Sequence, residues 1–128
     1  MAKIAFWALV LLFLVNLYVG LFQGWGANLY VSMVFHFLGG FFVAMLIASY
    51  YSSEFAKLPQ SLRFFAVVAF TIAIGVFWEM LEYLGSQYLT EPIYARFQYH
   101  VYFMGDLSDT VQDLLMDALG AIALSLTL

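Results

Sequence analysis

Residues 29–50 read LYVSMVFHFLGGFFVAMLIASY and contain no Asp, Glu, Lys or Arg. A helix that crosses the hydrocarbon core of a bilayer needs about 20 consecutive, predominantly apolar residues. This stretch has that length, and its only ionisable side chains are those of His36 and the tyrosines at its two ends. It therefore predicts a membrane-spanning helix with one imidazole inside it.

Three other stretches, 4–22, 62–86 and 107–128, are similar in length and apolar content. The chain of 128 residues is 66% hydrophobic and 9% charged, with a mean hydropathy of +0.96. Soluble domains carry about 25% charged residues. We therefore predict an all-α, polytopic membrane protein, in which residues 1–128 form a single transmembrane domain built as a bundle of four transmembrane helices.

The connections between these stretches differ in character. A glycine-rich turn at 23–28, which contains Trp25 at interface depth, and a polar turn at 52–60 make successive helices antiparallel neighbours. The connection at 87–105 is long and rich in Tyr and Phe, which favours an interfacial loop or short helix in the headgroup layer.

Basic side chains are unevenly distributed between the two sides of this arrangement. Lys3, Lys57 and Arg63 fall on one side, and Arg96 falls on the other. Because Lys and Arg are enriched in cytoplasmic connections, we predict that both termini are cytoplasmic.

Composition excludes several classes of function. Four basic residues against eight acidic ones, without a basic cluster, exclude a nucleic-acid partner. The absence of cysteine excludes disulfides, zinc–thiolate sites and iron–sulfur clusters. No Glu-x-x-His pair is present, which argues against a di-iron carboxylate bundle. Any chemistry must use imidazole, carboxylates, hydroxyls or amides.

Ionisable residues inside the predicted spans are costly to bury and are therefore candidate functional residues. They are His36, Glu79, Glu82, Asp109, Asp113 and Asp117, with Asn16 as a neutral companion. At a rise of about 1.5 Å per residue, all but Asp117 lie within about 3–11 Å of one membrane face. Asp117 lies deeper, near the midplane.

Residues three or four apart share a helix face, so the polar residues of each span form a stripe along one face of the helix. We call this stripe a polar seam, and it also contains small residues. Small residues allow transmembrane helices to approach closely, and we predict that the seams face one another. The predicted packing glycines are Gly20, Gly39, Gly40, Gly75 and Gly120.

The seams bring up to five carboxylates together, while every Lys and Arg lies at a span end or in a connection. Like charges in a low dielectric cannot all stay ionised, so either protons are shared or a cation is bound. Imidazole with carboxylates suits a divalent metal ion such as Mg²⁺, Mn²⁺, Ca²⁺, Zn²⁺ or iron. The predicted metal ligands are His36, Glu79, Glu82, Asp109 and Asp113, and the other predicted pocket residues are Asn16, Gln112 and Asp117.

Three motifs carry a resemblance: HFLGG at 36–40, WEMLE at 78–82 and GDLSDTVQDLLMDALGA at 105–121. They resemble the small bacterial YjdF-type membrane proteins and, more distantly, the VanZ-like family. VanZ-like proteins more often have Asn where this chain has Asp117. The resemblance implies a place, the envelope-facing side of a bacterial inner membrane, rather than a reaction.

Some of these residues also have structural readings. Asp106 is typical of an N-cap for the last span, and Asp109 lies near the same helix N-terminus. Glu82 is close enough to a span end to reach the interface. A lone His such as His36 is often a hydrogen-bonded packing residue.

We therefore predict a metal site that opens to the outer face and binds or acts on an anionic lipid or a lipid-linked envelope substrate; whether this is catalysis stays open. A second hypothesis is a proton- or cation-coupled transporter that uses Asp117. Because four spans are few for a transporter, this hypothesis requires a homo-oligomer. A third is a structural or assembly subunit whose protonated acids hold helices together.

Overall fold

The computed structural model describes residues 1–22 and 28–128. The predicted turn with Trp25 lies outside these residues, apart from Asn28, which caps the following helix. The described elements are α1 (Ala2–Phe22), α2 (Leu29–Tyr50), α3 (Ser52–Phe55), α4 (Gln60–Tyr88), α5 (Thr90–Phe97) and α6 (Leu107–Ser125). The all-α prediction is confirmed for the described part of the chain.

Among the described residues, three helices are long and apolar enough to cross a membrane. They comprise Ala2–Gly20 within α1, Leu29–Tyr50 and Gln60–Tyr88, each with a window of mean hydropathy 2.1. α6 has 19 residues but carries three aspartates, so its composition sets it apart from the other three. Its crossing of the membrane, and with it the four-span bundle, stays a prediction.

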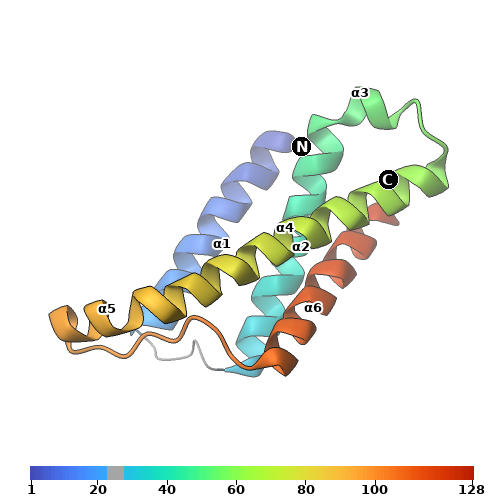
Figure 1. The fold of residues 1–128 in the computed structure, drawn as a ribbon. Coiled ribbons are helices and arrows are strands. Elements are labelled where there is room, and N and C mark those ends of the chain that lie inside the picture. Colours follow the sequence, from blue (N-terminus) through green and yellow to red (C-terminus); the bar gives the residue numbers. More distant parts are fainter. Residues whose placement is uncertain (23–27) are drawn as a thin grey trace.

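The long helices alternate in direction along the chain. α2 and α6 begin at one end of the molecule, and α1 and α4 begin at the other, where α3 also lies (Figure 1). Lys3, Lys57 and Arg63 belong to the end that carries α3, whereas Arg96 is in α5 at the opposite end. Three of the four basic residues therefore lie at one end of the folded molecule. That this end is cytoplasmic stays a prediction.

α6 packs along α2 and α4, and α1 packs against α2. Glycines permit the closest of these approaches: a Cβ on Gly120 would overlap the Phe37 carbonyl, and one on Gly40 would lie 2.6 Å from Asp117 Cα. Because α2 and α6 run in the same direction at this short separation, side chains at matching heights on the two helices face each other.

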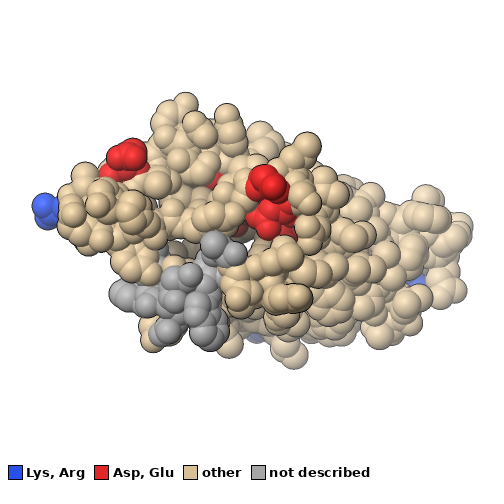
Figure 2. Space-filling model, turned by 90° about the horizontal axis from the view of Figure 1, so that it is seen from below, with Lys and Arg blue, Asp and Glu red and all other residues tan. Residues whose placement is uncertain are grey.

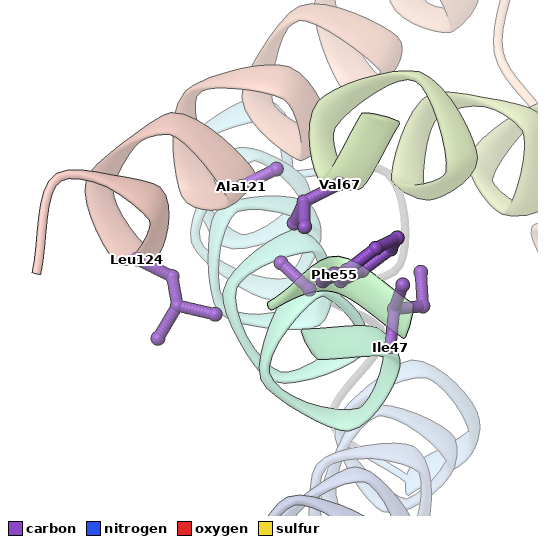
Figure 3. Packing of buried hydrophobic residues seen from close by; sticks show 6 residues of the cluster. Ile47, Phe55, Val67, Ala121 and Leu124 are labelled. Carbon is purple, nitrogen blue, oxygen red and sulfur yellow. The ribbon is translucent and has the colours of Figure 1, made fainter. Parts of the chain in front are cut away.

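The apolar core lies at the α3 end of the molecule. Its buried residues are Ala44 and Ile47 of α2, Phe55 of α3, Val67 of α4, and Ala121 and Leu124 of α6 (Figure 3). Large apolar side chains on the outer faces of α1, α2 and α4 remain exposed, as expected for surfaces in contact with lipid.

The long connection folds back on the bundle. Residues 90–97 form α5, and the following residues 98–106 return to the start of α6. The ring of Phe103 packs on Gly85, where a Cβ would be 3.0 Å from Phe103 Cδ1. This contact holds the returning segment over the end of α4.

Candidate functional site

The imidazole of His36, in α2, faces three carboxylates. Its Nε2 lies 3.5 Å from Asp113 Oδ2 and 3.9 Å from Glu79 Oε1, and its Nδ1 lies 3.5 Å from Asp117 Oδ1. Glu79 comes from α4 and both aspartates from α6, one helical turn apart. The three seams predicted from the sequence thus meet at one imidazole.

All four side chains are buried. The exposed fractions are 10% for His36, 7% for Glu79, 4% for Asp113 and 9% for Asp117. Glu79 Oε1 and the neighbouring Thr110 Oγ1 have no hydrogen-bond partner among the described residues. A buried carboxylate oxygen that faces His36 Nε2 at 3.9 Å without a hydrogen bond is costly, so it is a favourable position for a cation or a proton.

Asp113 is fixed by a hydroxyl one turn before His36 on the same helix. Ser32 Oγ donates a hydrogen bond to Asp113, 2.9 Å from Oδ1 and 3.1 Å from Oδ2. Residues four apart share a helix face, so Ser32 and His36 contact the same carboxylate from one side of α2.

Asp117 sits between two glycines. A Cβ on Gly40 would meet its backbone, and one on Gly75 would overlap its carboxylate. The missing side chains on α2 and α4 therefore make the space in which the Asp117 carboxylate reaches His36.

The described residues contain one group with the spacing of a metal site: His36, Glu79 and Asp113 offer ligand atoms that all lie within 4.8 Å of one another. Divalent ions bind nitrogen and oxygen ligands at about 2.0–2.6 Å, so ligands around one ion are separated by up to about 4–5 Å. The observed spacing fits a single ion without rearrangement of the helices.

The two other predicted ligands lie beside this group. Glu82 Oε1 accepts a hydrogen bond of 2.8 Å from Trp78 Nε1, and Asp109 Oδ2 accepts one of 3.1 Å from the Gly105 N–H. Both line a cavity of about 330 Å³ that His36 and Asp113 also line. We call this cavity the vestibule.

The vestibule lies at the end of the molecule where α6 begins. Acidic side chains show on this face and recede between neighbouring groups, while basic side chains show only at its periphery (Figure 2). Tyr102 of the returning segment lines the vestibule. Burial, together with the charges of Asp109 and Asp106, raises the pKa of Tyr102, so its hydroxyl stays protonated at neutral pH and can donate a hydrogen bond.

The remaining predicted residues are more dispersed. Asn16 lines the vestibule from α1. Gln112 lies on the outer side of α6, with its Nε2 3.4 Å from Ser108 Oγ. Asp106 is the N-cap of α6, as the sequence predicted, and accepts a hydrogen bond from the Asp109 N–H.

The glycines fall into two groups. Gly40, Gly75 and Gly120 mark the close approaches around α6, whereas Gly39 has no neighbour nearer than 4.0 Å to a Cβ and Gly20 has none within 4 Å. Gly39 lines a cavity together with Gly40 and Gly75, and Gly20 lines the vestibule.

Sequence reasoning missed several partners of the site. Ser32 is not among the predicted site residues, although its spacing of four residues from His36 is a readable signal. Trp78 has the same readable signal, since it lies four residues before Glu82 on α4. Thr110 has none, because its position beside Glu79 depends on how α6 approaches α4.

Residues 2–128 match a family described as "Predicted membrane protein (DUF2238)". The chain belongs to this family. Membership of DUF2238 confirms the prediction of an integral membrane protein in contact with the bilayer. Neither a curated protein nor a solved structure matches the chain.

Proposed function

We propose that this DUF2238 protein binds one divalent cation through His36 Nε2, Glu79 and Asp113. The observation that carries the proposal is the convergence of these groups from three helices, with a buried Glu79 oxygen that has no hydrogen-bond partner among the described residues. No Lys or Arg lies inside the long helices away from their ends, so a cation is the natural counter-charge.

The position of Asp117 supports this assignment. Histidines that bind metals usually direct the other ring N–H at a carboxylate or carbonyl, which fixes the tautomer and the ring orientation. Asp117 Oδ1 lies 3.5 Å from His36 Nδ1 and so takes that place. A proton on Nδ1 leaves the Nε2 lone pair directed at the two ligand carboxylates.

Three protein ligands leave coordination positions of a divalent ion open. Glu82, Asp109 and Tyr102 line the vestibule on the side of the site toward the start of α6. An ion in this position polarises a bound oxygen, and a carboxylate beside it can accept or deliver a proton. The same arrangement serves binding alone, so the proposal is a metal-dependent site and does not require turnover.

We extend this proposal to an anionic lipid or lipid-linked substrate at the outer face of a bacterial inner membrane. The distribution of Lys3, Lys57 and Arg63 at the α3 end supports placing the vestibule on the outer side. The resemblance to YjdF-type and VanZ-like proteins supports the same envelope-facing position.

The test is the metal content of protein purified in mild detergent, measured by elemental mass spectrometry. We expect about one divalent ion per chain in the wild type and its loss in His36→Ala and in Asp113→Asn. Asp106→Asn is the matched control on α6, because Asn caps a helix about as well as Asp and the residue lies outside the ligand group.

Wild-type protein that holds no stoichiometric metal, even after dialysis against Mg²⁺, Mn²⁺, Ca²⁺ and Zn²⁺ in turn, would contradict the proposal. Unchanged thermal stability of Asp113→Asn in the same preparation would then favour the structural-subunit hypothesis, in which an amide replaces a protonated acid. A liposome flux that depends on Asp117 would favour the transporter hypothesis.

A further inference from the structure

A second cavity, of about 520 Å³, lies among α1, α2 and α4. Its walls are almost wholly apolar and come from the stretches 6–16, 35–46 and 71–78. His36 and Asp117 form part of its wall. We call this space the apolar chamber.

The apolar chamber and the vestibule meet at the candidate metal site. His36 lines both, and so do Phe13, Asn16, Phe35 and Trp78. Phe13 and Trp78 touch edge to face, with ring centroids 6.0 Å apart, and join α1 to α4 at this boundary. The molecule therefore presents an apolar space on one side of the site and an acidic one on the other.

We propose that the apolar chamber holds one hydrocarbon chain of a phosphorylated amphiphile, whose phosphate reaches the metal bound by His36, Glu79 and Asp113. This inference rests on the proposed metal site. It names the class of ligand that the site takes: a long-chain phosphate ester drawn from the bilayer.

The dimensions and the chemistry of the two spaces favour this occupant. Ligand cavities are typically about 300–1,000 Å³, lined mainly by apolar side chains with a few polar groups that fix orientation. The apolar chamber lies within that range, and His36 and Asp117 line it on the side of the metal site. Ions such as Mg²⁺ are commonly held by one or two carboxylates and complete their coordination with substrate phosphate oxygens.

The principal competitor is an amphiphile with a cationic headgroup. Glu82 and Asp109 line the vestibule, and without a bound metal their charges would attract an organic cation. The two headgroups differ in their response to metal, because a phosphate requires the bound ion and a cation is repelled by it.

Gly39 allows the chamber to be filled without disturbing the helix packing. A Cβ there would meet Asp117 Oδ1 and Leu12 Cδ2 only at 4.0 Å, so the side chain of Gly39→Leu enters the space. Val10→Phe fills it from α1, on the side away from the metal ligands. Ala73→Leu is the control, because Ala73 lies on the exposed face of α4.

The experiment counts bound amphiphile by native mass spectrometry on metal-loaded protein in a neutral detergent. The probes are hexadecyl phosphate, butyl phosphate, which lacks the long chain, and hexadecyltrimethylammonium, which has the same chain and a cationic head. We expect one hexadecyl phosphate per chain, at least tenfold weaker retention of butyl phosphate, and loss of hexadecyl phosphate when the metal is chelated.

The variants separate the two proposals. Gly39→Leu and Val10→Phe should retain the metal and weaken hexadecyl phosphate binding at least tenfold, whereas Ala73→Leu should match the wild type. Binding that both filling variants leave unchanged while the metal is present overturns the ligand assignment and leaves the metal site standing. Preferential binding of hexadecyltrimethylammonium to the metal-loaded protein overturns the phosphate assignment. Wild-type protein without metal overturns the metal site itself, and the phosphate assignment with it.

Discussion

Gly39 and Gly40 are adjacent on α2 and provide a matched pair for testing the contact between α2 and α6. Replacing a helical Gly by Ala gains about 1 kcal/mol of helix propensity at either position, so this contribution cancels between the two variants. Their surroundings differ: a Cβ on Gly40 would lie 2.6 Å from Asp117 Cα, whereas one on Gly39 would have no neighbour nearer than 4.0 Å. Carbon atoms pack best at about 3.5–4.0 Å, so Gly40→Ala must push α6 away by about 1 Å.

Overpacking of this kind costs about 1–3 kcal/mol, so Gly40→Ala should be less stable than Gly39→Ala by that amount. For a chain of this size the difference corresponds to a Tm lower by roughly 4–12 °C. Thermal unfolding of both variants in the same detergent, followed by tryptophan fluorescence, measures it. Displacing Asp117 should also weaken metal binding in Gly40→Ala alone. Equal Tm values for the two variants would refute the close approach of α2 and α6.

The other predictions concern the neighbours of the site. Asp117→Asn should weaken metal binding about 10–100-fold in calorimetric titration, because a neutral amide oxygen accepts the His36 Nδ1–H hydrogen bond more weakly than a carboxylate does, and an unchanged Kd would show that the Asp117 charge does not orient the ring. Ser32→Ala removes the hydroxyl donor from the buried Asp113 and should destabilise metal-free protein by about 1–3 kcal/mol, with a smaller loss once metal is bound; equal losses in both forms would contradict this. Asp106→Ala should destabilise α6 by about 0.5–2 kcal/mol while Asp106→Asn stays close to the wild type, and an equal loss of Tm in both would refute its role as a cap.

The helices themselves were largely predictable because hydrophobic length is a strong signal. The predicted stretch 29–50 coincides with α2, and the predicted 62–86 falls within the longer α4, which extends to Gln60 and Tyr88. The fourth stretch was harder to interpret, because its aspartates lower its hydropathy while marking its buried face. Two of the three aspartates that count against a membrane span in α6, Asp113 and Asp117, are the ones that lie against His36.

The site was predictable to the level of the helix face but not of the single contact. Depth and spacing predict that His36, Glu79 and Asp113 share a layer, and the structure places their ligand atoms within 4.8 Å. The same reasoning favours Glu79 over Glu82 only by depth, because both lie on one face of α4 and Glu82 is nearer the end of the span. The distinction comes from Trp78, which bonds Glu82 within its own helix and leaves Glu79 for the interior.

Asp117 illustrates the other limit. Its depth predicts a buried acid, but its place against His36 Nδ1 depends on glycines in two other helices, Gly40 and Gly75, which make room for it. Such a contact needs the relative rotation and separation of three helices at once. Local sequence spacing does not contain that information.

The most direct test of the proposed metal site is pulsed electron paramagnetic resonance on protein loaded with one equivalent of Mn²⁺ in mild detergent. Modulation of the Mn²⁺ echo by a directly bound imidazole nitrogen reports whether His36 is a ligand. If His36 is a ligand, we expect this modulation in the wild type and in His100→Gln, which removes the chain's other imidazole. We expect its loss in His36→Gln. Mn²⁺ bound without nitrogen modulation in the wild type, or with modulation that persists in His36→Gln, would contradict the assignment of His36 as a metal ligand.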